Sequence, residues 1–120
     1  MDEKKILIVE DEPALASIVL QMLEVFGWTG IITSSAHEAL QQLDAEEFRF
    51  ILMDLSLPDK SGLQLYEDVI QKNPDYRGRV VFSSGYNVSG DLEDVIKRDN
   101  LQFLPKPYSI NKFKEILEKW

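Results

Sequence analysis

Short apolar runs alternate along the chain with longer segments in which apolar residues recur every three or four positions. The short runs are only four to six residues long and are bounded by polar residues, which favours strands. The longer segments have the spacing of amphipathic helices. The predicted strands cover residues 6–9, 29–33, 48–53, 79–83 and 101–104, and the predicted helices cover 13–26, 36–43, 63–70, 92–96 and 110–120.

Residues with special backbone or capping properties mark the ends of the predicted helices. Gly27 ends the first helix, and the pair Asn73-Pro74 breaks the third. Ser35 and Glu38 have the spacing of a capping box at the start of the second helix. Ser109 is predicted to cap the last helix.

The apolar runs are nearly continuous rather than alternating, which is typical of strands that are covered on both faces. Five such strands, each followed by a helix, predict a parallel sheet between two layers of helices. We therefore expect an α/β fold, a doubly wound (βα)5 sandwich, in a single domain over residues 1–120. In such sheets ligands bind beyond the carboxyl ends of the strands, near the point where the strand order reverses.

Composition narrows the class of protein. The apolar fraction of 44% is that of a globular domain, and the formal net charge of −8 disfavours direct binding to nucleic acid. The absence of cysteine excludes disulfides and thiolate chemistry and fits a cytoplasmic protein. The charged start of the chain and the short apolar run after it predict neither a signal peptide nor a membrane span.

Reactive side chains follow the ends of four predicted strands. Because parallel strands end at one edge of a sheet, these groups are expected to converge there. They are Glu10, Asp11 and Glu12 after the first strand, Asp54 after the third, Ser83, Ser84 and Gly85 after the fourth, and Lys106 and Pro107 after the fifth.

This set of groups suits phosphoryl chemistry with a magnesium ion. Carboxylates held close together repel one another, and a hard divalent cation with oxygen ligands relieves that repulsion. A lysine and a hydroxyl beside the metal can hold phosphoryl oxygens. Asp54 can then act as a nucleophile toward phosphorus and form an acyl phosphate.

Four segments at matching spacing resemble the receiver domains of two-component response regulators. They are "VEDE" (Val9–Glu12), "MDLSLPDKSG" (Met53–Gly62), "SSGY" (Ser83–Tyr86) and "LPKP" (Leu104–Pro107). The resemblance covers the whole chain, and it implies a flavodoxin-like sheet with strand order 2-1-3-4-5. "FSSGY" and "FLPKPY" also look like segments of receivers attached to hybrid histidine kinases.

The resemblance implies a role for each matching residue. Asp54 corresponds to the phosphoacceptor, and Ser84 and Lys106 lie 30 and 52 positions after it, as the family's hydroxyl and lysine do. Glu10 and Asp11 match the paired acids of the magnesium site, which is completed by Asp54 and the backbone carbonyl of Ser56. Phe103 matches the aromatic switch residue, although a frequent tyrosine is replaced by phenylalanine. Ser56 and Tyr86 match positions that tune phosphate lifetime, and a cis Lys106–Pro107 bond is implied.

The implied function is that of a phosphoacceptor switch rather than an enzyme with a separate substrate. A histidine kinase or phosphotransfer domain would supply the phosphoryl group from a phosphohistidine. Ser84 and Phe103 would carry the change to the surface of the fourth helix, fifth strand and fifth helix, where an output partner or a second copy would dock. The chain is expected to be either a stand-alone receiver or one taken from a longer protein.

Three other functions are less consistent with the sequence. A magnesium-dependent phosphohydrolase would need an Asp-x-Asp pair, but Leu55 and Ser56 follow Asp54. A flavodoxin-like cofactor binder would need a phosphate loop rich in Ser, Thr and Gly after the first strand, where the acids at 10–12 would repel a phosphate. A receiver that cannot be phosphorylated would lack a site residue, and every one is present.

Each motif taken alone also has an ordinary structural explanation. Residues 10–12 could be an acidic helix start that the helix dipole favours, and Asp54, Ser83, Ser84 and Lys106 could be turn or loop residues. His37 is expected on the surface, and Trp28 and Trp120 are expected to pack. The common spacing of all four segments favours the receiver interpretation.

Overall fold

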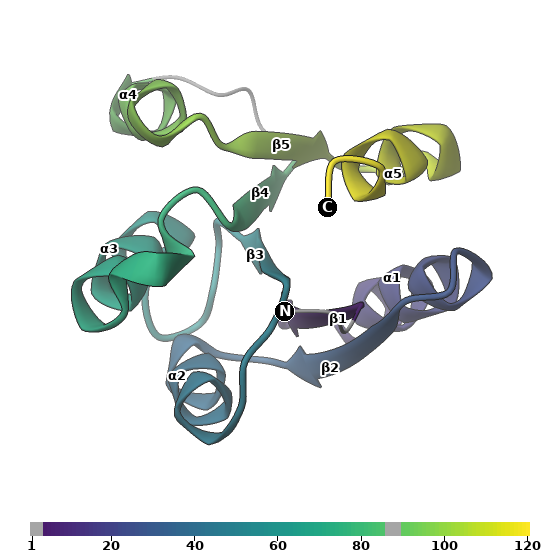
Figure 1. Cartoon of the computed structure of the whole chain (residues 1–120), viewed down its shortest axis with the longest axis horizontal. Coiled ribbons are helices and arrows are strands. Elements are labelled where there is room, and N and C mark those ends of the chain that lie inside the picture. Colours follow the sequence, from purple (N-terminus) through teal and green to yellow (C-terminus); the bar gives the residue numbers. More distant parts are fainter. Residues whose placement is uncertain (1–3, 86–89) are drawn as a thin grey trace.

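The computed structural model describes residues 4–85 and 90–120, which form one parallel five-stranded sheet with helices on both faces (Figure 1). The strands are β1 (Lys5–Val9), β2 (Thr29–Thr33), β3 (Phe50–Asp54), β4 (Val80–Ser84) and β5 (Gln102–Pro105). The helices are α1 (Pro13–Val25), α2 (Ala36–Ala45), α3 (Gly62–Lys72), α4 (Gly90–Asp99) and α5 (Ile110–Leu117), with a short 3-10 turn over Pro74–Tyr76. The strand order is β2-β1-β3-β4-β5, which confirms the predicted doubly wound fold.

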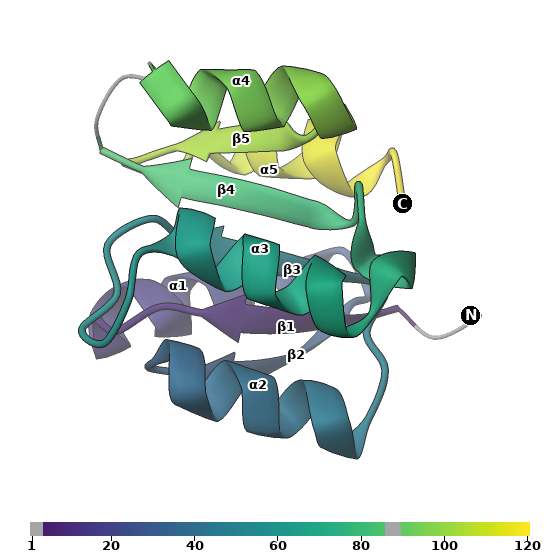
Figure 2. The same cartoon turned by 90° about the vertical axis from the view of Figure 1, so that its left-hand side faces the viewer.

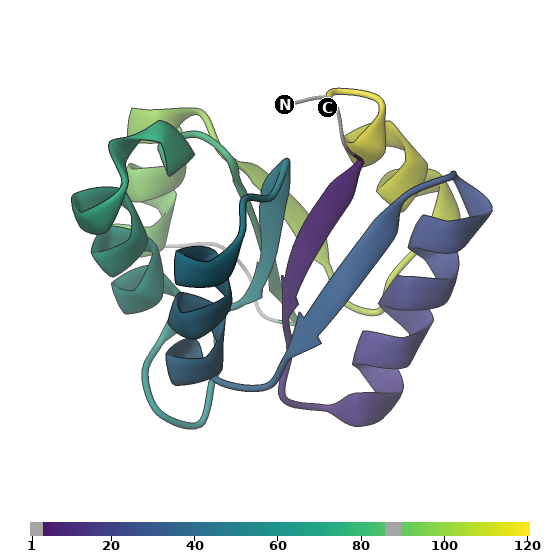
Figure 3. The same cartoon turned by 60° about the horizontal axis from the view of Figure 1, so that its bottom comes forward.

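The helices divide into two layers. Helices α1 and α5 cover one face of the sheet, and α2, α3 and α4 cover the other (Figure 3). Alternate residues of β3 pack against the two helix layers, because successive side chains of a strand point to opposite faces. Ile51 and Met53 belong to the apolar cluster on the α2–α3 side, whereas Phe50 and Leu52 belong to the one on the α1–α5 side. Every residue of β3 is buried, as the continuous apolar run predicts.

The predicted start of the second helix is only partly correct. Ser35 Oγ accepts a hydrogen bond from the Glu38 amide at 3.1 Å, as predicted for the cap. The Glu38 carboxylate, however, accepts from the amide of Ser34 at 2.7 Å and from its hydroxyl at 2.8 Å. In a capping box this carboxylate would accept from the amide of the N-cap residue, which is Ser35. A complete capping box forms instead at Ser61 and Gln64, before α3. The sequence there has the S-x-x-Q pattern of such a box.

Two predicted boundaries at the carboxyl-terminal part of the chain also differ from the structure. α4 runs over ten residues, Gly90–Asp99, and is longer than the short helix predicted from its three apolar residues. α5 ends at Leu117, so Trp120 lies beyond the helix. Trp120 instead stacks on Phe50 at a ring distance of 4.9 Å and donates from Nε1 to Gln102 Oε1 at 2.8 Å. Tertiary packing at the edge of the sheet therefore fixes this residue.

A buried carboxylate at the end of α4 joins three elements. The Asp99 side chain is 3% exposed and accepts hydrogen bonds from Tyr66 Oη at 2.7 Å and from Arg77 Nη1 at 2.8 Å. Arg98 donates to the same carboxylate and also contacts Glu67 of α3 at 3.0 Å. Burial is the main cause that raises the pKa of Tyr66 to about 12, so its phenol keeps the proton that it donates. The network ties the end of α4 to α3 and to the segment before β4.

We expect this network to make stability depend on pH. The hydrogen bonds from Arg98 lower the pKa of Asp99 most, burial opposes them, and Tyr66 and Arg77 lower it further, so the net pKa lies well below the usual range. A lowered folded-state pKa gives stability that is present above the unfolded pKa of about 3.9 and is lost as the pH falls. Asp99→Asn should therefore lower the free energy of unfolding by about 1–3 kcal/mol at pH 7.

Urea unfolding of wild type and Asp99→Asn at pH 7 and pH 3 measures this effect. The difference between the two proteins should shrink at the lower pH. Asp94→Asn, an exposed aspartate on the same helix, is the matched control and should leave stability nearly unchanged. An equal difference between wild type and Asp99→Asn at both pH values would contradict the prediction.

Candidate functional site

The carboxyl-terminal ends of the strands lie at one edge of the sheet, on the side away from the chain's C-terminus (Figure 2). This edge holds the predicted site residues. Asp54 is the last residue of β3, and Ser83 and Ser84 are the last two residues of β4. Glu10 and Asp11 follow β1, and Lys106 follows β5. The parallel topology therefore brings together groups that are up to 96 positions apart in the sequence (Glu10 to Lys106, 106 − 10).

Three carboxylates form a cluster at this edge. Glu10 and Asp54 are buried, Asp11 is exposed, and one oxygen of each lies within 4.8 Å of the others. The ammonium of Lys106 lies 2.9 Å from Glu10 Oε1 and 3.2 Å from Asp54 Oδ2. When all four groups are ionised, three negative charges and one positive charge leave a net charge of −2. The cluster therefore favours a further cation.

Burial and charge act in opposite directions on these groups. Burial is the largest effect on Glu10 and raises its pKa, while the nearby ammonium of Lys106 works against it. Burial lowers the pKa of Lys106, but the contacts with Glu10 and Asp54 outweigh it, so the net pKa is raised. Lys106 thus stays protonated, as a group that neutralises carboxylate or phosphoryl oxygens must.

The donor set fits a magnesium ion. All three groups offer carboxylate oxygens, which are hard ligands, and among the described residues the cluster contains no sulfur or imidazole group. Glu10 Oε1 is buried, and although it lies close to the Lys106 ammonium it accepts no well-aligned hydrogen bond from the part of the chain that the structure describes. Such an oxygen can accept a bond from a metal-bound water. Magnesium holds its ligands at about 2.0–2.1 Å and keeps several waters, so direct and water-mediated contacts suit a cluster of this width.

The loop after Asp54 is held tightly against β3. The Ser56 amide donates to Asp54 Oδ1 at 3.2 Å, which places Ser56 beside the carboxylate, while a role of its carbonyl in metal binding stays a prediction. The Gly62 amide donates to Leu55 O at 2.9 Å where the loop returns. A Cβ atom on Gly62 would lie 2.4 Å from the carbonyl oxygen of Asp54, so only glycine fits this close approach.

The same loop also caps a neighbouring helix, which sequence analysis did not predict. The Asp59 carboxylate accepts from the amides of Ala36 at 2.9 Å and His37 at 3.0 Å, at the start of α2. These bonds lower the pKa of Asp59. His37 is exposed, as expected, and Asp59 carried no spacing signal because its partners lie more than twenty residues away.

The two hydroxyls at the end of β4 are both buried. Ser84 is 4% exposed, and Ser83 is 1% exposed and lies 2.9 Å from the hydroxyl of Tyr108. Tyr108 was not singled out from the sequence, since no motif or spacing rule pairs it with Ser83. The Lys106–Pro107 bond is cis, as the resemblance implied. Tyr86 lies outside the described residues.

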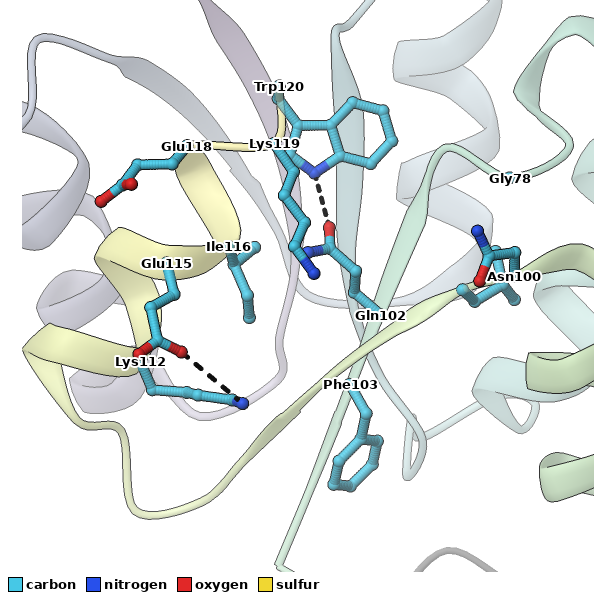
Figure 4. Close-up of a pocket in the computed structure, with 11 residues that line it drawn as sticks. Gly78, Asn100, Gln102, Phe103, Lys112, Glu115, Ile116, Glu118, Lys119 and Trp120 are labelled. Carbon is cyan, nitrogen blue, oxygen red and sulfur yellow. Dashed lines mark hydrogen bonds and ion pairs between the residues drawn. The ribbon is translucent and has the colours of Figure 1, made fainter.

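The predicted switch residue lines a groove away from the carboxylates. Phe103 is half-buried on β5 and borders a groove of about 710 Å³ between β5 and α5 (Figure 4). Lys112, Glu115 and Ile116 of α5 line its other side, and Trp120 and Gln102 lie together at one end. The groove is therefore a surface of mixed charge with an aromatic side chain in it.

Within residues 4–85 and 90–120, no helix combines the length and the apolar character needed to cross a membrane.

Comparisons with known proteins agree with this architecture. The family model of the response regulator receiver domain matches residues 6–118. The transcriptional regulatory protein CitB of Klebsiella pneumoniae is 29% identical over 122 residues, which cover 100% of this chain and 51% of CitB. The chain thus spans about half the length of this relative.

Two solved structures share the fold. A response regulator receiver domain from Methylobacillus flagellatus is 26% identical, with a TM-score of 0.85 over 98% of each chain. The receiver domain of sensor histidine kinase PA1611 from Pseudomonas aeruginosa PAO1 is 22% identical, with a TM-score of 0.83 over 98% of this chain and 97% of that one. That structure has a magnesium ion coordinated in its active site cleft.

Proposed function

The chain belongs to the response regulator receiver domain family, and from this premise we propose that Asp54 is its phosphoacceptor. The family has a phosphoacceptor role in two-component signalling. One observation carries the assignment to Asp54: its buried carboxylate lies at the end of β3, 3.2 Å from the Lys106 ammonium and within the acidic cluster. A buried acid in that position has both the nucleophilic oxygen and the neighbouring positive charge that phosphoryl transfer needs.

The proposed reaction is an in-line transfer from a phosphohistidine. An oxygen of Asp54 attacks the phosphorus, the P–O bond of an acyl phosphate forms, and the P–N bond to the donor imidazole breaks with its electron pair leaving on nitrogen. Lys106 then pairs with a phosphoryl oxygen in place of Asp54 Oδ2, and the hydroxyl of Ser84 donates a hydrogen bond to another. The domain thus assists its own phosphorylation and dephosphorylation.

Glu10, Asp11, Asp54 and the Ser56 carbonyl are the residues that would hold magnesium, with Glu10 acting mainly through bound water. Bound magnesium supplies positive charge that offsets the negative charge of the phosphoryl oxygens. The support is the all-oxygen cluster of this chain and the magnesium ion in the receiver domain of PA1611. The role of each ligand belongs to the proposal.

Receiver domains interact with histidine kinases or phosphotransfer proteins and with output domains. For this chain we assign the donor to a kinase or phosphotransfer domain, and the output to the surface of α4, β5 and α5, which contains the groove at Phe103. The net charge of −8 supports an assignment without direct nucleic-acid binding or membrane contact. We assign residues 1–120 to one receiver domain of cytoplasmic location.

The proposal is tested by incubating the protein with acetyl phosphate and Mg²⁺ and measuring its intact mass. One added phosphoryl group that depends on Mg²⁺ supports the proposal. No added mass under these conditions would contradict it.

Ser84→Ala should separate phosphorylation from switching. The buried hydroxyl of Ser84 is proposed to move toward the phosphoryl group, which vacates space into which Phe103 turns. Because ligands shift the populations of existing conformations, loss of this contact should weaken the coupling. Ser84→Ala should still accept phosphate on Asp54, yet show less than about half of the wild-type response at Phe103, if one hydrogen bond of 0.5–1.5 kcal/mol is lost.

NMR chemical shifts around Phe103, with and without the phosphoryl mimic beryllofluoride, measure this response. Lys106→Ala is the comparison variant and should lose more, because it removes a full charge from the site. If Ser84→Ala moves as far as wild type, Ser84 does not couple the two sites. If wild type does not move at Phe103, the switch lies elsewhere.

A further inference from the structure

A hydrogen bond between two hydroxyl side chains lies beside the acidic cluster. Ser83 Oγ and Tyr108 Oη are 2.9 Å apart, and either hydroxyl can donate. We propose that this pair positions Lys106 for phosphoryl transfer, so that Ser83 and Tyr108 are positioning residues of the site. The inference rests on the proposed role of Asp54 and adds two residues to it.

Ser83 is fixed with respect to Asp54 by the sheet. The two residues are register partners on neighbouring strands, and the Leu55 amide donates to Ser83 O at 3.1 Å. Ser83 is 1% exposed, so its hydroxyl needs a partner inside the protein, and Tyr108 provides one. A group bonded to Ser83 therefore has a defined position relative to the phosphoacceptor.

Tyr108 links the lysine loop to that fixed point. It lies two residues after Lys106 and just before the cap of α5, and its ring packs against the apolar cluster on the α1–α5 side. On the other side of the loop, the Lys106 amide donates to Ser84 O at 2.9 Å. The backbone that carries Lys106 is thus bonded to β4 by a main-chain bond at Lys106 and by a side-chain bond at Tyr108.

Lys106 needs this restraint because its side chain is long and has many rotamers. Its ammonium contacts Glu10, just after β1, at 2.9 Å and Asp54, at the end of β3, at 3.2 Å. A charge stabilises a transition state most effectively when it is already in position, because it then needs no reorganisation during the reaction. Burial raises the pKa of Tyr108, so its phenol stays neutral and the bond to Ser83 persists over the working pH range.

Tyr108→Phe and Ser83→Ala each remove one hydroxyl of the pair while keeping most of the packing. We expect each variant to be phosphorylated by acetyl phosphate about three to ten times more slowly than wild type at saturating Mg²⁺, which corresponds to about 0.7–1.4 kcal/mol in the barrier. The double variant should be no slower than the slower single one, because both changes break the same bond. Mg²⁺ affinity should change by less than about twofold, because a positioning role through Lys106 leaves the metal ligands intact.

Tyr76→Phe is the matched control. Its hydroxyl also makes a buried hydrogen bond, from the Phe48 amide at 3.1 Å, but at the opposite edge of the sheet. This variant should lose stability in urea unfolding without losing phosphorylation rate. Urea unfolding of all variants verifies that the rates come from folded protein, and Ser83→Ala tests the bond if Tyr108→Phe does not fold.

The outcomes separate this inference from the proposed function. If wild type is phosphorylated on Asp54 and both single variants react at its rate, the hydroxyl pair has no positioning role and the proposed function stands. Additive effects of the two substitutions would also overturn the inference. So would a loss of Mg²⁺ affinity as large as the loss of phosphorylation rate. If wild type itself takes up no phosphoryl group, the proposed function fails and this inference fails with it.

Discussion

Asp11→Asn is expected to lose most of its Mg²⁺ affinity and to be phosphorylated at least about a hundredfold more slowly than wild type, because metal charge stabilises phosphoryl oxygens by several kcal/mol. Asp11 is the exposed member of the carboxylate cluster, so its oxygen is accessible to a hydrated ion. The substitution keeps the shape of the side chain and removes its charge. It also relieves repulsion among the carboxylates, so the free protein should be as stable as wild type or more stable.

Mg²⁺ titration by calorimetry or NMR measures the affinity, and acetyl phosphate measures the rate. Glu12→Gln is the matched control, since Glu12 is an exposed acid next to Asp11 that lies outside the cluster. It should bind Mg²⁺ with nearly wild-type affinity. Unchanged affinity in Asp11→Asn, or equal losses in both variants, would contradict the assignment of Asp11 as a ligand.

The layered fold could be predicted because each of its signals is local. The apolar runs found β1 to β5, and their continuity indicated burial on both faces, which the structure confirms for β3. The ends of the helices and strands were predicted less accurately, because they depend on contacts between distant residues. Trp120 satisfies helical periodicity, yet its stacking on Phe50 and its bond to Gln102 hold it outside α5.

The candidate site could be predicted only as a set of residues. The order of the strands brings Glu10, Asp54 and Lys106 together, and the family spacing in the sequence predicts all three. Tyr108 could not be found in this way, because its partner Ser83 is on another strand and the bond depends on the path of the loop. The role of Asp59 could not be predicted either, because it lies in the loop after β3 and caps α2, which is distant in the sequence.

Asp54→Asn is expected to abolish phosphorylation completely, because the amide nitrogen and oxygen of asparagine cannot form the acyl phosphate. The substitution is close in shape, and its amide can still lie near Lys106, so the fold should persist. Lys60→Ala, in the loop after β3 and outside the cluster, is the matched control and should be phosphorylated like wild type.

The most direct test of the account is the intact mass of wild type and Asp54→Asn after incubation with acetyl phosphate and Mg²⁺. The account predicts one phosphoryl group on wild type, lost on treatment with mild base, and none on Asp54→Asn or on wild type without Mg²⁺. A phosphoryl group that remains in Asp54→Asn and survives mild base would indicate a serine or threonine ester, and Asp54 would not be the acceptor.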